Sequence, residues 1–237
     1  MADRYYVPGG FGEGQIKLAG TEAHHLLSVM RAKVGDRVEL FDGLGATASG
    51  EIVAATNKSA TVRILETAPA PAASGPKLTL VTAVPKGERF RWLVEKATEL
   101  GVERLVPLAA ARSVVLPGRG KLETMQQTVI AACKQSGRNV LMKIDRVTTW
   151  DEFVARDPAA GPAVIAHPSG QTIAEFLQVP IERDVTAVVG PEGGFTEAEI
   201  ESATAAGARL VSLGTNILRT ETAAVAMAAI LIPRLQT

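Results

Sequence analysis

Two glycine-containing loops near the end of the chain hold the residues whose types could do chemistry. The first, Gly-Pro-Glu-Gly-Gly at residues 190–194, follows a β-branched apolar run at 185–189. Glycine allows positive φ and close approach of the backbone to a ligand. The second loop begins at Gly214 and leads through Arg219 into an apolar helix. We interpret both as ligand loops at the C-terminal ends of strands, where open α/β sheets bind ligands.

Glu192, Arg219 and Glu221 are charged residues in or beside these loops. An Arg–Glu pair could fix a loop or orient a substrate, whereas each acid could instead stabilise a helix N-terminus through the helix dipole. The glycine spacing matches neither the G-x-G-x-x-G fingerprint nor the P-loop, which argues against a dinucleotide or a nucleoside triphosphate. The residues alone leave the ligand undefined.

Strands and helices alternate around the two loops. Strands are expected at 78–84, 104–107, 163–166, 185–189 and 210–213, and helices at 88–100, 122–136, 172–177, 197–207 and 221–231. Thr196 and Glu199 form a capping box for one helix, and Thr220 is a cap candidate for the last. The alternation predicts a mostly parallel sheet with helical cover.

Residues 1–66 have a different pattern. Short strands are expected at 5–7, 15–18, 37–41, 51–55 and 60–65, with one helix at 21–33. Short strands at this spacing predict a small β-barrel. The uncharged stretch TAPAPAASGP at 67–76 is typical of a linker, so we expect domains at about 1–70 and 71–237.

Charge is distributed unevenly along a chain whose formal net charge is zero. Residues 86–146 contain 12 Lys or Arg and 6 Asp or Glu, whereas residues 147–237 contain 5 and 11. A polyanion such as RNA would therefore dock on the middle third, although basic helix surfaces are common without a partner. Within it, Lys86 and Arg89 lie between a strand and a helix, Arg112 follows a strand, and Arg138 follows a helix end.

The remaining sequence features favour a cytoplasmic protein without a metal or a membrane segment. Cys133 is the one cysteine, which excludes an internal disulfide and fits a reducing compartment. No apolar stretch is long enough to span a bilayer, and the start lacks a signal-peptide pattern. Adjacent His24 and His25 point about 100° apart on a helix, so one is expected near the core rather than on a metal.

Several segments together resemble one known family. They are KGERFRWLVEKATELGVERLVPL at 86–108, ARSVV at 111–115, QSGR at 135–138, GPEGGFTEAEI at 190–200, SLGTNILRTETAA at 212–224 and AHHLLSVMRAKVGDRVELFDG at 23–43. The chain is similar over nearly its full length to the RsmE family, bacterial methyltransferases that modify N3 of a uridine in 16S ribosomal RNA. The resemblance implies a PUA-like N-terminal domain and a SPOUT-class α/β domain.

The resemblance further implies a C-terminal trefoil knot at about 185–231, S-adenosyl-L-methionine as the methyl donor, and a homodimer acting on 16S rRNA or the 30S subunit. The donor site it implies consists of His167, Gly190, Glu192, Gly193, Gly194, Leu213, Gly214, Asn216, Ile217, Leu218 and Thr222. The catalytic residues implied are Arg112, Glu192 and Arg219. Those expected to bind RNA are Arg31, Lys33, Lys86, Arg89, Arg91, Arg112 and Arg138.

Two positions depart from the family pattern. Family members usually have arginine where this chain has Ser28 and Asn216, and the change removes a positive charge at each place. Two other functions stay open at this point: a non-catalytic RNA-binding protein and a SPOUT methyltransferase that acts on tRNA. The intact sequences of both glycine loops argue against the first.

Overall fold

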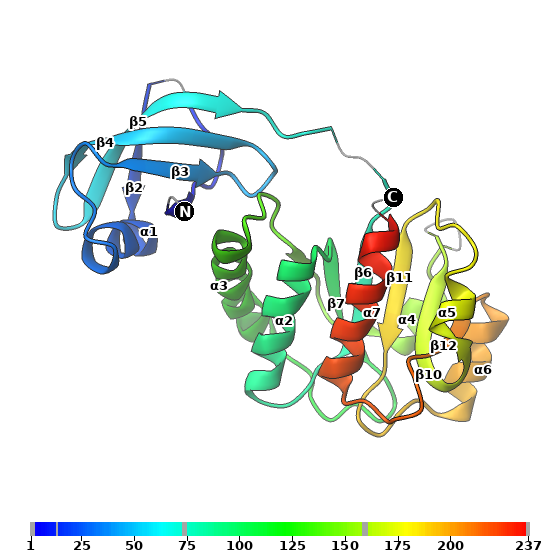
Figure 1. Cartoon of the computed structure of the whole chain (residues 1–237). Coiled ribbons are helices and arrows are strands. Elements are labelled where there is room, and N and C mark those ends of the chain that lie inside the picture. Colours follow the sequence, from blue (N-terminus) through cyan, green and yellow to red (C-terminus); the bar gives the residue numbers. More distant parts are fainter. Residues whose placement is uncertain (1–2, 13, 73–74, 158–160, 236–237) are drawn as a thin grey trace. The chain divides into compact units, whose positions relative to one another are not determined.

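The computed structural model describes residues 3–12, 14–72, 75–157 and 161–235 (Figure 1). The chain divides into two compact units, of which the first combines Met1–Ala73 with Ile130–Leu141 and the second combines Ser74–Val129 with Met142–Thr237. Each unit has its own sheet and its own buried cluster.

The first unit is a five-stranded curled sheet. Its strands are β1 (Arg4–Tyr6), β2 (Gln15–Ala19), β3 (Arg37–Phe41), β4 (Thr47–Ala55) and β5 (Ser59–Ala68), in the order β1-β3-β4-β5-β2. Only the β1–β3 pair is parallel among these pairings. The strand predicted at 37–41 is confirmed as β3, in which Val38 and Leu40 are buried while Arg37 and Glu39 are exposed. The predicted β-rich first domain is therefore confirmed.

The helix of the first unit is shorter than the predicted span of 21–33. It consists of α1 (Gly20–His24) and a π-helical turn, η1 (His25–Val29). Arg31, with φ of 56°, lies in the left-handed region and prevents the helix from continuing to Lys33. The prediction that one histidine lies near the core is confirmed: the His25 ring is 5.9 Å from that of fully buried Tyr5.

Residues 130–141 complete the first unit. Arg4 donates hydrogen bonds to the Cys133 carbonyl at 3.0 Å and to the Asn139 side chain. Lys134 pairs with Glu22 at 3.0 Å, and both side chains are mostly buried. These contacts join the end of α3 (Arg119–Ser136) to the β1–α1 part of the same unit. The first unit is therefore not one continuous stretch of chain.

The second unit is built on a parallel sheet. Its strands are β6 (Leu78–Ala83), β7 (Arg104–Ala109), β8 (Lys143–Ile144), β9 (Thr148–Thr149), β10 (Ala163–Thr172), β11 (Val185–Val189) and β12 (Arg209–Ser212). The order is β12-β10-β11-β6-β7-β8, with β9 paired to β7 and every pair parallel. The predicted α/β class is thus confirmed.

Helices cover both faces of this sheet. They are α2 (Glu88–Leu100), the start of α3, α4 (Trp150–Val154), α5 (Ile173–Phe176), α6 (Glu197–Ala205) and α7 (Thr220–Leu235). Figure 1 shows α2 and α7 side by side in front of the sheet, and α7 contacts both β6 and β11. Trp150 and Phe153 of α4 pack with Ala203 of α6 against Val188. All five residues of β11 are consequently buried.

Three short elements were not predicted: β8, β9 and α4. The α4 helix is opened by a capping box between Thr149 and Glu152. Hydrogen bonding from Arg146, and then from the Thr149 backbone, lowers the pKa of Glu152 to about 2. Strands of two residues carry too little periodicity to be recognised in a sequence.

Candidate functional site

The first glycine loop follows directly from the buried strand β11. A Cβ on Gly190 would lie 2.8 Å from the Phe195 ring, so the backbone approaches that ring more closely than a side chain allows. Gly194 has φ of 70° and donates its N–H to the Pro191 carbonyl at 2.8 Å. Both positions therefore require glycine for the loop to take this shape.

The far end of this loop is anchored in the core. Phe195 is buried, and its ring centroid is 4.8 Å from that of Trp150. The predicted capping box is confirmed, because Thr196 and Glu199 hydrogen-bond reciprocally. Glu199 also accepts a hydrogen bond from Ala111 N at 2.7 Å, which ties the segment after β7 to α6.

Arg112, in the segment after β7, contacts the first loop through its side chain. Its Nη1 donates to the Gly193 carbonyl at 2.8 Å and to the Phe195 carbonyl at 3.4 Å. A Cβ on Gly193 would lie 3.3 Å from the Cβ of Arg112, so these two backbones are also close. Arg112 is exposed, and a guanidinium has further N–H groups that can reach a ligand.

The second loop connects β12 to α7. Ser212 Oγ is 3.1 Å from the Gly214 carbonyl and 3.4 Å from the Gly214 N–H. Ile217 is 82% exposed, and Arg219 is also exposed. Thr220 was expected to cap α7, but its hydroxyl instead donates to the Gly190 carbonyl at 3.0 Å. The beginning of α7 is therefore hydrogen-bonded to the first loop.

These segments enclose a cavity of about 360 Å³. Its walls are Ala166, His167 and Pro168 after the first part of β10, residues 189–195, residues 212–218, and Thr220 and Ala223 of α7. In Figure 1 the two loops lie at the same, lower edge of the sheet. The parallel strands bring their C-terminal ends to one edge, as the sequence led us to expect.

Most of the residues predicted for the donor site line this cavity. They are His167, Gly190, Glu192, Gly193, Gly194, Leu213, Gly214, Asn216, Ile217 and Leu218. Thr222 is exposed on α7 and does not belong to the wall, whereas Thr220 and Ala223 do. The helical repeat brings every third or fourth residue to one face, so this difference is one of register at the start of α7. Phe195 also lines the cavity but was not among the predicted donor-site residues. Its position between a glycine loop and a capping box could have indicated that it belongs to the wall.

His167 is held by its neighbour. Its Nδ1 lies 2.8 Å from Ser169 Oγ and 3.3 Å from the Ser169 N–H, from which it accepts. Accepting from that N–H leaves the other ring nitrogen to carry the proton when the ring is neutral. The bulge between Ala166 and Gln171 in the β10–β12 pairing places this turn beside the cavity.

Glu192 belongs to an ionic cluster at the cavity wall. Arg89 Nη2 lies 3.8 Å from Glu192 Oε1, and Arg89 Nη1 lies 3.4 Å from Glu221 Oε1. Glu221 is 6% exposed, whereas Glu192 is exposed. Arg89, predicted to bind RNA, is thus already paired with two carboxylates.

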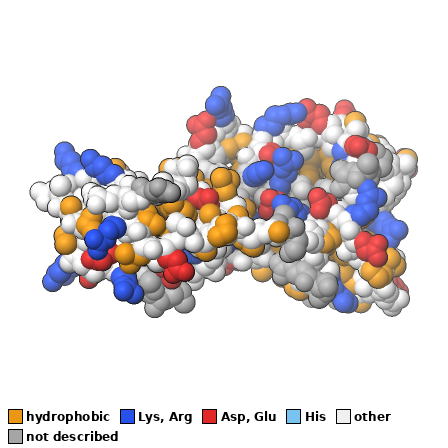
Figure 2. All heavy atoms as spheres, turned by 90° about the horizontal axis from the view of Figure 1, so that it is seen from above, with side chains coloured by type: hydrophobic (Ala, Val, Ile, Leu, Met, Phe, Trp, Pro, Cys, Tyr) orange, Lys and Arg blue, Asp and Glu red, His pale blue; other side chains and the backbone are white. Residues whose placement is uncertain are grey.

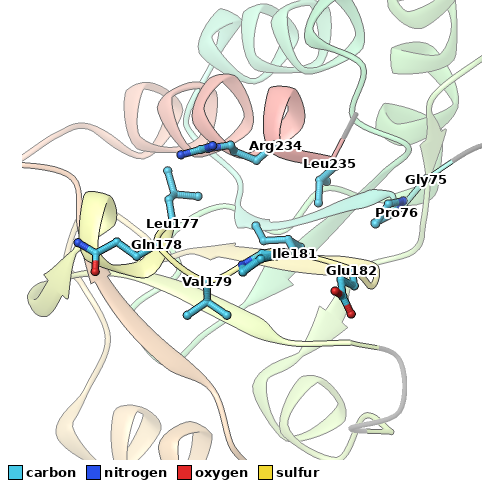
Figure 3. Close-up of a pocket in the computed structure, with 10 residues that line it drawn as sticks. Gly75, Pro76, Leu177, Gln178, Val179, Ile181, Glu182, Arg234 and Leu235 are labelled. Atoms are coloured by element: carbon cyan, nitrogen blue, oxygen red, sulfur yellow. The ribbon is translucent and has the colours of Figure 1, made fainter. Parts of the chain in front are cut away.

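A larger cavity, of about 640 Å³, lies at the other end of α7 (Figure 3). Leu177, Val179 and Ile181 face it together with Leu235, and Glu182 and Arg234 are its charged lining residues. None of the residues predicted for catalysis or donor binding lines it. Size alone would favour this cavity, but the residues predicted for donor binding line the smaller one.

The residues predicted to bind RNA belong to both units. Arg31, Lys33 and Arg138 are in the first unit, and Lys86, Arg89, Arg91 and Arg112 are in the second. The basic middle third is partly neutralised, because Arg104 pairs with Asp145 at 3.1 Å and Lys96 with Glu99 at 2.8 Å. Figure 2 shows acidic and basic side chains close together on one face.

Within residues 3–12, 14–72, 75–157 and 161–235, no group of three or more His, Cys, Asp or Glu could hold a metal ion. In that same part of the chain, every helix is too short or too polar to cross a membrane.

Comparisons with known proteins identify the family. Residues 73–232 match a family described as an RNA methyltransferase domain, and residues 18–65 match an RNA methyltransferase PUA domain. Ribosomal RNA small subunit methyltransferase E of Bacillus subtilis is 30% identical over 217 residues, which is 87% of this chain and 85% of that protein. The Synechocystis protein of the same name is 32% identical over 230 residues, which is 94% of this chain and 75% of that protein.

A solved structure agrees with these relatives. Ribosomal RNA small subunit methyltransferase E from Neisseria gonorrhoeae, bound to S-adenosyl methionine, superimposes with a TM-score of 0.89. The two sequences are 29% identical, and the alignment covers 98% of this chain and 97% of that one. The resemblance drawn from the sequence is therefore confirmed, and the chain belongs to the ribosomal RNA small subunit methyltransferase E family.

Proposed function

We propose that this chain transfers a methyl group from S-adenosyl-L-methionine to N3 of a uridine in the 16S rRNA of the small ribosomal subunit. The observation that carries the proposal is the cavity of about 360 Å³ formed by two glycine loops at the C-terminal edge of the parallel sheet. A relative of similar structure is bound to S-adenosyl methionine. A tRNA substrate is the alternative, and the RNA that the purified protein methylates distinguishes the two.

The wall of the cavity suits this donor. Its volume lies within the roughly 300–1,000 Å³ that is typical of small-molecule pockets. Gly190 and Gly194 leave the backbone without side chains where a ligand would approach, and Leu213, Ile217 and Leu218 supply apolar surface. We assign these residues, with His167, Gly193, Gly214 and Asn216, to donor binding. When bound, the donor supplies an electrophilic methyl group on a positively charged sulfur.

The substrate uridine needs help from the protein, because its N3 is protonated and weakly nucleophilic at neutral pH. Glu192 is the acid on the cavity wall, so we assign it to accept the N3 proton. Loss of that proton leaves negative charge on the O2 and O4 oxygens of the base. Arg112, which contacts the first loop, or Arg219, in the second loop, would stabilise this charge as an oxyanion hole does. Both residues are exposed.

Basic residues of both units would bind the RNA. We assign Arg31, Lys33 and Arg138 of the first unit, and Lys86, Arg91 and Arg112 of the second, to phosphate contacts. A stacked uridine cannot reach a cavity between two loops, so the target base must be flipped or lie in locally opened RNA. Arg89 is not assigned to a phosphate contact, because its side chain is already paired with Glu192 and Glu221.

Four further assignments accompany this function. We propose that residues 1–70 and 71–237 act as the RNA-binding and catalytic domains, and that residues 185–231 form a trefoil knot. We also propose a cytoplasmic homodimer with the site near the subunit interface. The 82% exposure of Ile217 on the second loop supports a partner surface there, since a large exposed apolar side chain gains stability when covered.

The decisive experiment is mass spectrometry of 16S rRNA from a strain in which the gene is deleted. We expect one uridine methyl group to disappear and to return with the wild-type gene but not with Glu192→Gln. Purified protein should methylate 30S subunits and leave tRNA unmodified. Unchanged 16S rRNA in the deletion strain would overturn the assignment, and transfer to tRNA alone would identify the alternative substrate.

A further inference from the structure

Arg89 occupies an unusual electrostatic position for a residue expected to bind RNA. It lies in the first turn of α2, directly after the segment that leaves β6. Its two terminal nitrogens contact carboxylates from two different places: Glu192 in the first loop at 3.8 Å and Glu221 in the first turn of α7 at 3.4 Å. The guanidinium therefore joins α2, α7 and the donor loop.

Glu221 is the buried carboxylate of this cluster. The residue is 6% exposed, and a buried carboxylate without a cation would be strongly unfavourable. Its Oε1 contacts Arg89, whereas Oε2 has no hydrogen-bond partner among the residues that the structure describes. Arg89 is thus the cation that compensates a buried charge, which restricts where its guanidinium can lie.

The charges of the cluster disfavour a phosphate. One guanidinium faces two carboxylates, so the three side chains together carry a net charge of about −1 near neutral pH. A phosphate that approached Arg89 would meet the exposed carboxylate of Glu192 at the same place. Arg91, two residues further along α2, is exposed, so its guanidinium is accessible to a phosphate.

We propose that Arg89 is a positioning residue: it holds the Glu192 carboxylate at the wall of the donor cavity, and buried Glu221 fixes Arg89 in turn. The inference rests on the proposed function, because it gives Glu192 the acceptor role. It moves Arg89 from the RNA-binding set to the catalytic machinery. It also gives a role to Glu221, which does not line the cavity.

The test uses full-length protein and 30S subunits, and compares Arg89→Ala, Arg89→Lys and Glu221→Gln with Arg91→Ala. Arg89→Ala is expected to lower kcat about 10- to 100-fold through misplacement of the acceptor, with little change in KM for RNA. Arg89→Lys keeps the positive charge but lacks the planar guanidinium that contacts two carboxylates at once. It should therefore recover part of kcat. Arg91→Ala should raise KM and reduce the salt slope of RNA binding by about 1.

The pH profile of kcat separates positioning from a purely structural role. Removing the cation in Arg89→Ala makes ionisation of the acceptor less favourable, so the acid limb of the profile should move to higher pH. Removing an anion in Glu221→Gln should move the same limb to lower pH. Arg112, whose charged side chain also contacts the loop, is unchanged in both variants.

Arg119→Ala is the matched control, because Arg119 is 93% exposed and pairs only with Glu123 among the ion pairs of the described residues. It should leave kcat, KM and the pH profile as in the wild type. The positioning role is overturned if Arg89→Ala changes KM and salt slope as Arg91→Ala does, or if the two acid limbs move in the same direction. If the wild-type protein transfers no methyl group to 30S subunits, the proposed function fails instead.

Discussion

The two loops that form the cavity are held in different ways. Side chains from elsewhere in the chain hold the first loop: Arg112 bonds to the Gly193 carbonyl, Thr220 bonds to the Gly190 carbonyl, and Phe195 is buried in the core. The hydrogen bonds described for residues 212–219 of the second loop are mostly local, between Ser212 and Gly214. Residues 214–219 are all exposed.

This difference indicates how the cavity works. The first loop is formed before any ligand arrives, so it loses little conformational entropy on binding. The second loop presents apolar side chains to solvent and gains its contacts when a ligand or a partner covers them. Substitutions in the first loop should therefore lower both stability and donor affinity, whereas those in the second should lower donor affinity alone.

Gly190→Ala should have the largest effect. Its Cβ would lie 2.8 Å from the Phe195 ring, which is buried and packs against the ring of Trp150. Overpacking of this kind lowers the free energy of unfolding by about 1–3 kcal/mol. If the loop conformation that binds the donor is destabilised by the same free energy, donor affinity falls about 5- to 150-fold. Denaturant unfolding and calorimetry with S-adenosyl methionine measure the two quantities.

Gly120→Ala is the control for this substitution. Gly120 lies in α3, and a Cβ there meets no atom within 4 Å. Because Gly120 lies in the first turn of α3, stability should stay within about 0.5 kcal/mol of the wild type. A Gly190→Ala protein that is as stable as the wild type and binds donor equally well would show that the first loop is not rigid.

Arg112→Ala comes next. It removes the hydrogen bonds to the Gly193 and Phe195 carbonyls, and we expect the free energy of unfolding to fall by about 1 kcal/mol, since Arg112 is exposed. Arg219→Ala, in the second loop, should stay within about 0.5 kcal/mol of the wild type. Equal stability losses in denaturant unfolding of the two variants would contradict the difference between the loops.

Thr220→Val tests the bond that joins α7 to the first loop. Valine has nearly the same shape, but it cannot donate to the Gly190 carbonyl. The loss should be about 0.5–1 kcal/mol of unfolding free energy, with a few-fold weaker donor binding. Thr220→Ser keeps the hydroxyl and should retain most of the donor affinity. Identical calorimetric affinities for the valine and serine variants would assign the bond no role in binding.

Ile217→Ala should have the smallest effect on stability. Because the side chain is 82% exposed, the free energy of unfolding should change by less than about 0.5 kcal/mol. Donor affinity should nevertheless fall a few-fold, since the cavity loses apolar wall. A stability loss comparable to that of Thr220→Val would mean that the second loop is packed before ligand binding.

The sequence predicts the framework of this site better than its contacts. Strand β11 and helix α2 begin and end where their apolar periodicity and flanking glycines indicate. The capping box at Thr196 was equally readable, because it depends on residues three positions apart. Patterns such as these can be recognised in a sequence because the residues that form them are close together along the chain.

The contacts that connect distant segments could not be predicted in this way. Arg89 and Glu221 are separated by 132 positions, and a basic residue after a strand is compatible with either RNA or an internal carboxylate. The hydroxyl of Thr220 likewise had two uses, as a helix cap or as a donor to Gly190. The packing of α7 against α2 decides the first of these alternatives, and its packing against β11 decides the second.

The position of residues 130–141 in the first unit has a consequence for biosynthesis. The ribosome releases the N-terminal sheet strands long before Lys134 and Asn139, which contact Glu22 and Arg4. At about 5–20 residues per second, this delay lasts several seconds. During that interval Arg4 and Glu22 have only their partners within the N-terminal segment, Glu39 and the Tyr6 N–H, and lack the contacts that residues 130–141 supply later. A gene truncated after residue 73 would encode a sheet that never receives its last segment.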